Sequence, residues 1–116
     1  MGVDFTRCNP YAFSITCVDT VLDYSIFYGC KLRQTVFRGC SLKQVEFEQA
    51  DLTGVVFNEC NLEAANFQQS KLEKADFRTA HHFSIDPEAN KVKGAKFSSQ
   101  NLAGLLGKYR LDIRLD

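Results

Sequence analysis

Residues 50–69 read ADLTG VVFNE CNLEA ANFQQ, four five-residue units in which the third residue is Leu or Phe. The same spacing runs without a gap over twelve positions: Leu22, Phe27, Leu32, Phe37, Leu42, Phe47, Leu52, Phe57, Leu62, Phe67, Leu72 and Phe77. The residue two places before each of these is small: Thr20, Ser25, Cys30, Thr35, Cys40, Val45, Ala50, Val55, Cys60, Ala65, Ser70 and Ala75. Hydrophobic periodicity is the main structural signal in a sequence, so residues 20–80 are predicted to form one continuous repeat.

A period of five fits neither an α-helix nor a flat strand. At about 100° per residue a helix would scatter successive positions around its axis, and in a strand an odd step alternates faces. If the chain instead turns a corner of about 90° after each unit, four units close one coil and every central residue points inward. The small residue lies on the same side, because side chains repeat every second residue. The other three positions, such as Lys31, Arg33 and Gln34, then face water.

This geometry predicts separate columns of Leu and Phe inside the coils. Leu42 is expected directly above Leu62, and the phenylalanines form two columns, one through Phe27 and one through Phe37. Burying each Leu or Phe contributes about 1.5–3 kcal/mol. The twelve central residues are therefore expected to form the core and to dominate stability.

The units that carry a family resemblance are those beginning at Ala50, Cys60, Ala65 and Ala75. They match the pattern A-(D/N)-(L/F)-x-x of the pentapeptide-repeat proteins, which the sequence therefore resembles. The resemblance implies an all-β fold, a right-handed quadrilateral (square) parallel β-helix. Its coils are expected to stack about 4.8 Å apart and to be joined by backbone hydrogen bonds.

Both ends depart from the repeat, which suggests four segments. Residues 1–19 are predicted to form an irregular N-terminal coil or cap, because Phe13 and Val18 lie one residue out of phase. The repeat proper covers 20–80, and residues 81–91 are predicted to be an inserted loop. Residues 92–116 are expected to hold the final repeat strands, a short C-terminal amphipathic helix capped by Ser98 or Ser99, and a tail strand.

The predicted C-terminal helix is too short to be stable alone, so it either caps its own solenoid or meets a second copy. This tail resembles that of the bacterial microcin-immunity and quinolone-resistance pentapeptide-repeat proteins, through the stretch from Ile85 to Asn90. The resemblance implies a homodimer joined by the C-terminal segment. Its candidate contacts are Leu102, Leu105, Leu106, Tyr109, Ile113 and Leu115.

Charge and composition indicate which partners and which compartment to expect for the chain. Fourteen basic and fourteen acidic residues give no net charge, so we expect no direct binding to nucleic acid or to an anionic membrane. No apolar run approaches the roughly 20 residues of a membrane span, and no secretory signal is evident. Five cysteines without a CxxC pair favour a reducing compartment. The protein is expected to be cytoplasmic.

The sequence contains no recognisable catalytic or cofactor motif, so we expect no enzyme, no cofactor and no metal site. A filled coil offers no cleft for convergent polar groups. His81 and His82 are adjacent and are interpreted as ordinary loop residues. Cys40 and Cys60 fall one coil apart in the column of small residues, where a disulfide is sterically allowed but reduced thiols are favoured.

Acidic residues give the remaining functional clue. Between Gln44 and Ser70 there is no Lys or Arg, and the candidate acidic partner face comprises Glu46, Glu48, Asp51, Glu59 and Glu63. Two hypotheses follow. The first is a non-catalytic interaction or scaffold protein with an unidentified protein partner. The second rests on the resemblance, which implies a protector that imitates DNA and binds a type II topoisomerase such as gyrase.

Overall fold

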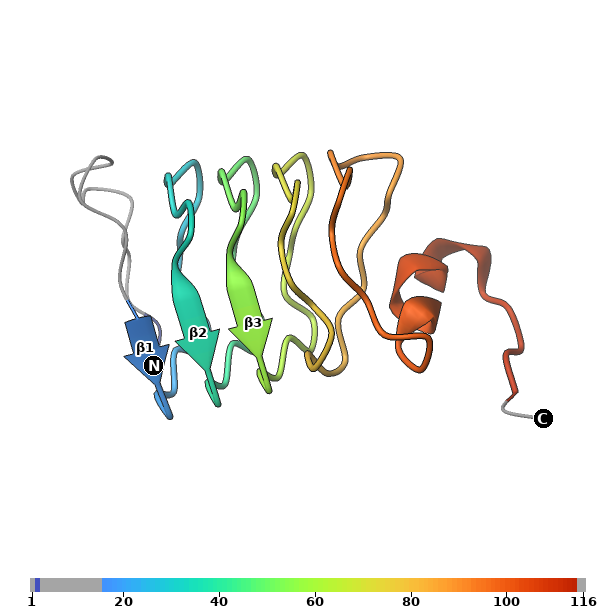
Figure 1. Ribbon diagram of the computed structural model, residues 1–116, viewed down its shortest axis with the longest axis horizontal. Coiled ribbons are helices and arrows are strands. Elements are labelled where there is room, and N and C mark those ends of the chain that lie inside the picture. The colour runs from blue at the N-terminus through green and yellow to red at the C-terminus, as the bar shows by residue number, and fades with distance from the viewer. Residues whose placement is uncertain (1, 3–15, 115–116) are drawn as a thin grey trace.

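The computed structural model describes residue 2 and residues 16–114. Its three strands are β1 (Thr16–Val18), β2 (Val36–Arg38) and β3 (Val56–Asn58), which pair in parallel in that order (Figure 1). Each strand residue pairs with the residue twenty positions later, as Val36 does with Val56. The predicted repeat of twenty residues per coil is therefore confirmed.

Three further ladders of single parallel bridges run beside the strands. They join Val21, Ser41, Asn61 and His81; Ile26, Glu46 and Asn66; and Lys31, Asp51, Lys71 and Lys91. With the β1–β3 ladder, this gives one ladder for each five-residue unit of the coil. Ser41 pairs with Asn61, so the following residues, Leu42 and Leu62, stack as predicted. The fold is a parallel β-solenoid of the β-helix type.

The corners between units are tight turns of the backbone. The carbonyl of a central residue accepts a hydrogen bond from the N–H three residues on, as Leu32 O does from Thr35 N at 3.0 Å. The residue directly before the donor N–H has a left-handed backbone, with φ of +62° at Gln34 and +71° at Gly54. Glycine suits this conformation because it has no Cβ. Sequence periodicity located the corners but did not identify this requirement.

The core is filled by the two phenylalanine columns and the leucines between them. Eleven of the twelve predicted core residues are at most 2% exposed, and Leu22, at the N-terminal end, is partly buried. Rings within a column lie nearly parallel, with centroids 5.5 Å apart for Phe37 and Phe57 and 5.1 Å for Phe57 and Phe77. The two columns meet edge to face, at 5.8 Å between Phe47 and Phe57, an arrangement favoured for aromatic pairs.

The repeat begins earlier than predicted. β1 pairs with β2, and Cys17 lies opposite Phe37, so Cys17 occupies a central position five residues before Leu22. The prediction of an irregular coil is wrong for residues 16–19, because a small apolar residue replaces Leu or Phe and hides the register. Val18, which suggested a phase slip, is exposed. The rest of the predicted N-terminal cap, Phe13 included, lies outside the described residues.

Residues 81–91 are not an insertion. His81 pairs with Asn61 and Lys91 with Lys71, so the twenty-residue register passes through this segment unbroken. The segment departs from the five-residue pattern because it closes the core. Phe83 and Ile85 are buried, and the Phe83 ring lies 5.5 Å from that of Phe77.

The C-terminal segment forms two short 3-10 helices, η1 (Leu102–Leu105) and η2 (Gly107–Tyr109), and not the predicted amphipathic helix. Asn101, not Ser98 or Ser99, precedes η1. Gly104 and Gly107 interrupt the segment, and glycine disfavours a continuous helix. Residues 111–114 form no strand, contrary to the predicted tail strand.

Candidate interaction surfaces

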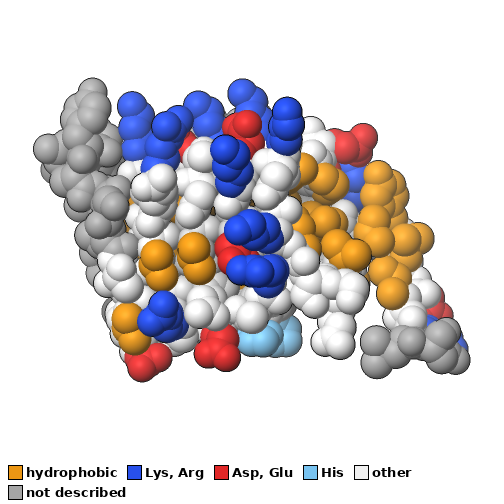
Figure 2. Space-filling view, viewed as in Figure 1, with side chains coloured by type: hydrophobic (Ala, Val, Ile, Leu, Met, Phe, Trp, Pro, Cys, Tyr) orange, Lys and Arg blue, Asp and Glu red, His pale blue; other side chains and the backbone are white. Residues whose placement is uncertain are grey.

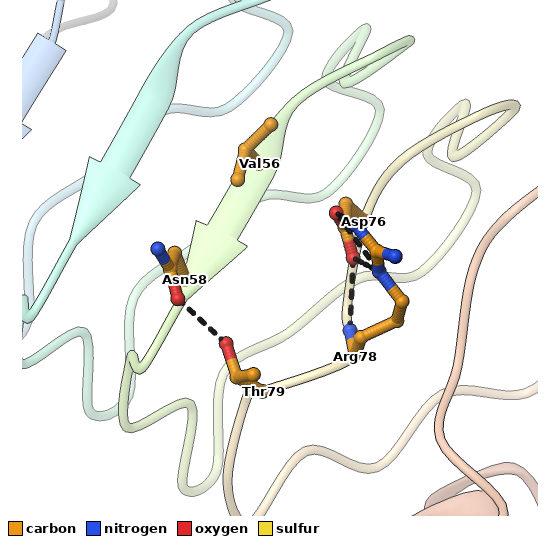
Figure 3. A pocket seen from close by; sticks show the side chains of 5 residues that line it. All are labelled: Val56, Asn58, Asp76, Arg78 and Thr79. Carbon is orange, nitrogen blue, oxygen red and sulfur yellow. Dashed lines mark hydrogen bonds and ion pairs between the residues drawn. The ribbon is translucent and has the colours of Figure 1, made fainter.

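One hollow on the solenoid wall lies between β3 and residues 76–79, with a volume of about 430 Å³ (Figure 3). Its polar side chains are paired with one another. Arg78 binds the Asp76 carboxylate through Nε and Nη2, at 3.0 and 2.8 Å, and Thr79 Oγ1 donates to Asn58 Oδ1 at 2.8 Å. A catalytic pocket needs convergent groups free to act on a ligand. Here these groups are occupied within the wall.

The structure spreads the five predicted acidic residues around the coil. Glu46 and Glu48 belong to the Ile26 ladder, Asp51 to the Lys31 ladder, and Glu63 to the unit that follows the Asn61 bridge. Glu59 follows β3 directly. Each of the four ladders therefore carries one or two of these carboxylates. They form a ring around one region of the solenoid and not a single acidic face.

Several of these carboxylates are held by neighbouring residues. Asp51 makes an ion pair with Arg33 at 2.7 Å and accepts a hydrogen bond from Thr53 Oγ1 at 2.6 Å. Burial alone would raise the pKa of Asp51, but the hydrogen bonds from Thr53 and Arg33 outweigh it and lower the pKa below its ordinary value. Glu46 accepts from the Glu48 N–H at 2.8 Å and from Asn66 Nδ2 at 3.2 Å.

Cysteine and histidine side chains form no reactive centre in the described region. Cys17, Cys40 and Cys60 are free thiols. Cys60 Sγ donates to the Phe37 carbonyl at 3.2 Å, and burial raises the pKa of its thiol to about 12, which keeps it protonated and unreactive. The His81 and His82 rings are exposed, with centroids 6.3 Å apart. Among the described residues, no group of three or more His, Cys, Asp or Glu is placed to hold a metal ion.

The C-terminal end carries most of the predicted dimer contacts as exposed apolar side chains (Figure 2). Exposed side chains there are Leu102, Leu106, Tyr109, Leu111 and Ile113. Leu105 instead packs against the core, so it belongs to the cap of its own solenoid. Leu115 lies outside the described residues. The sequence left two roles open for this segment, capping its own solenoid or meeting a second copy. Leu105 packs on the core as a cap would, and the exposed side chains are free to meet a second copy.

Four ladders around a filled core define a parallel β-solenoid that presents side-chain walls to solvent. The chain belongs to the pentapeptide-repeat family, since the family model described as a pentapeptide repeat region matches residues 1–77. Proteins of this family are generally non-enzymatic repeat proteins. No helix in the described part of the chain is long and apolar enough to cross a membrane.

Several solved structures are similar to this chain at low identity. A pentapeptide repeat protein (Rfr23) from the cyanobacterium Cyanothece 51142 is 16% identical with a TM-score of 0.36, covering 72% of this chain and 60% of its own. This chain thus spans about 60% of that protein's length. Full-length QnrB1, a plasmid-mediated fluoroquinolone resistance protein, is 11% identical with a TM-score of 0.33, covering 95% of this chain and 97% of its own. A pentapeptide repeat protein from the Arabidopsis thaliana thylakoid lumen is 14% identical with a TM-score of 0.31, covering 77% and 66%. No curated protein matches the chain.

Proposed function

We propose that this protein is a non-catalytic interaction module, a rigid scaffold that presents its walls to a protein partner and pairs with a second copy through its C-terminal end. The exposed apolar C-terminal end supports this proposal most directly. The core is filled by Phe and Leu, and the polar groups of the wall hollow are paired with one another. Function therefore rests on surfaces and not on a reaction centre.

The C-terminal end fits self-association because part of it has no cover within the chain. Leu111 and Ile113 are 56% and 54% exposed and follow η2 beyond the last coil. Large apolar side chains grouped at one end of a soluble protein are typical of an interaction site. A dimer through this end would bury them and would also cover the terminal coil of each copy.

Size-exclusion chromatography with light scattering tests the dimer. We expect the wild type to elute as a dimer and the double variant Leu106→Glu/Ile113→Glu to elute as a monomer. Val21→Glu is the matched control, because Val21 is 69% exposed on the coil that begins with β1, at the opposite end of the solenoid. It should leave the dimer intact. A monomeric wild type would contradict the proposed association.

The second hypothesis, a DNA-imitating protector of a type II topoisomerase, has weaker support. It rests on the resemblance of the tail, and the ring of acidic residues lacks the single charged face that imitation of duplex phosphates needs. A gyrase supercoiling assay with and without a quinolone separates the two hypotheses. Protection of gyrase by the added protein would favour the second, and an unchanged assay favours the scaffold.

We propose that the coil is right-handed and quadrilateral, as in the family it belongs to, and that the protein works in a bacterial cytoplasm. The four ladders per coil support a four-sided coil. The buried free thiols of Cys40 and Cys60 support a reducing compartment such as the cytoplasm. A crystal structure tests the first, and fractionation of the source cells tests the second.

A further inference from the structure

The zero net charge of the chain conceals a sorting of charges by wall. The lysine wall, defined here as residues 31–35, 51–55, 71–75 and 91–95, follows the Lys31–Asp51–Lys71–Lys91 ladder. It carries six basic side chains and two acidic ones, a net charge of +4: Lys31, Arg33, Lys71, Lys74, Lys91 and Lys93, with Asp51 and Glu73. Figure 2 shows Lys and Arg side chains gathered along the upper edge of the molecule.

The preceding wall has the opposite composition. Residues 26–30, 46–50, 66–70 and 86–90 contain four carboxylates and no Lys or Arg, a net charge of −4: Glu46, Glu48, Asp86 and Glu88. Two of these are compensated locally, because Lys108 from η2 forms ion pairs with both Asp86 and Glu88. The two opposite sums cancel in the composition, which is why the net charge of the chain does not reveal a charged surface.

The uncompensated positive charge lies on the last two coils. On the earlier coils Arg33 is paired with Asp51 at 2.7 Å. Lys71, Lys74, Lys91 and Lys93 are all exposed, and none of them is in an ion pair within the described part of the chain. Glu73 is the carboxylate between them, and it also interacts electrostatically with Arg33.

Lys71 and Lys91 are direct partners in the ladder. Like charges placed opposite each other on neighbouring strands destabilise the pairing. Beside them, at the corner with the preceding wall, lies a hollow of about 320 Å³, which both lysines help to line together with residues of that preceding wall. Ser70, Asn90 and the Glu88 carboxylate also line it. Ser70 Oγ already donates to the Phe67 carbonyl at 2.6 Å, Asn90 Nδ2 donates to the Asp86 carbonyl at 2.8 Å, and Glu88 is in an ion pair with Lys108. The two ammonium groups are thus left to meet an anion.

We propose that the lysine wall binds the phosphate backbone of duplex nucleic acid without reading its sequence. Lysine supplies compact point charges that suit phosphate oxygens, and such contacts carry no sequence information. The wall presents no exposed aromatic side chain within these units, so it lacks the stacking platform that favours single strands. It also presents no exposed large apolar side chain of the kind that anchors a protein in a bilayer surface. This departs from the expectation based on net charge, because the relevant quantity is the charge of one wall.

Fluorescence anisotropy of a labelled duplex DNA of about 20 base pairs at low and rising salt tests the proposal. With about four phosphate contacts, the logarithm of the binding constant should fall with the logarithm of salt concentration with a slope of about −3 to −4. The variant Lys71→Gln/Lys91→Gln should reduce binding on the order of tenfold at low salt and bring the slope closer to zero by about 2. Lys74→Gln/Lys93→Gln, on the same two coils, should act in the same direction.

Lys43→Gln is the matched control, because Lys43 is an exposed lysine on the Ser41 ladder. It should bind the duplex like the wild type. Thermal melts will establish that every variant is folded, since all these side chains are exposed. Equal binding by the wild type and both double variants would overturn the proposal. So would stronger competition by a single strand than by the duplex, or binding to anionic vesicles without binding to the duplex. None of these outcomes bears on the light-scattering test of the dimer.

Discussion

The middle coils and the C-terminal end contain the same kinds of apolar residue but differ in what covers them. In the middle, each ring is covered by identical rings, as Phe57 is by Phe37 and Phe77. At the end, Phe97 stacks on Phe77 on one side, and its other ring contact, Phe83, lies tilted at 47°. Repetition stabilises the middle, whereas the end needs residues that break the repeat. The apolar surface left over at the end is what remains available for association.

The largest expected effect compares the two places within one aromatic column. Phe57→Ala should lower the free energy of unfolding by about 3–5 kcal/mol, because it leaves a cavity between two stacked rings. Phe97→Ala should cost clearly less, because Phe97 is only partly buried. Urea unfolding followed by circular dichroism measures both. Equal losses would show that the end is as tightly packed as the middle.

Gly104 lies in η1, in the segment that caps the C-terminal end of the solenoid. A Cβ at this position would collide with the Phe83 ring and lie 2.7 Å from the Phe83 carbonyl oxygen. Gly104→Ala should therefore destabilise the protein by about 1–3 kcal/mol, the usual cost of overpacking. Ala103→Ser, at the exposed neighbouring residue of η1, is the control and should be close to neutral. Thermal melts of the two variants and the wild type measure both effects. A neutral Gly104→Ala would mean that the 3-10 segment does not pack on Phe83.

A smaller effect of opposite sign is expected in the middle coils. Thr35 is fully buried in the column of small residues, and its Oγ1 has no hydrogen-bond partner. Thr35→Val keeps the shape and removes this unpaired hydroxyl, so it should stabilise the protein by about 1 kcal/mol. Thr53→Val is the matched control, because Thr53 Oγ1 donates to Asp51 and its loss should be destabilising. The paired denaturation curves should shift in opposite directions.

The sequence was sufficient for the middle of the fold because one residue type at one spacing carries the information. Leu42 and Leu62 stack as the period of five requires, since no other arrangement puts both inside. The ends were harder to predict. Cys17 continues the core with a residue that the Leu and Phe pattern does not count, and Phe83 and Ile85 fill the core from outside the five-residue spacing.

Surface function was less predictable than the core. A run of sequence without Lys or Arg suggested an acidic face, but neighbours in sequence lie on different walls of a coil, as Glu59 and Glu63 do. Residues twenty apart, such as Lys71 and Lys91, share a wall. Sorting residues by their position within the twenty-residue coil is enough to reveal the lysine wall. Linear charge runs therefore mislead in a solenoid, and column sums are informative.

The smallest expected effect concerns the charge pair that interrupts the lysine wall. The pKa of Asp51 is lower in the folded protein than its ordinary value. A carboxyl with a lowered folded pKa stabilises the fold at pH values above its unfolded pKa, and the stabilisation is lost as the pH falls through the folded pKa. The contribution should be roughly 0.2–1 kcal/mol, because the Arg33 partner is 64% exposed and solvent screens the pair. Urea unfolding at neutral and acidic pH should therefore show a shallower acid loss in Asp51→Asn than in the wild type. If Asp51→Asn and the wild type lose stability in parallel as the pH falls, the ion pair between Asp51 and Arg33 contributes nothing to the stability of the fold.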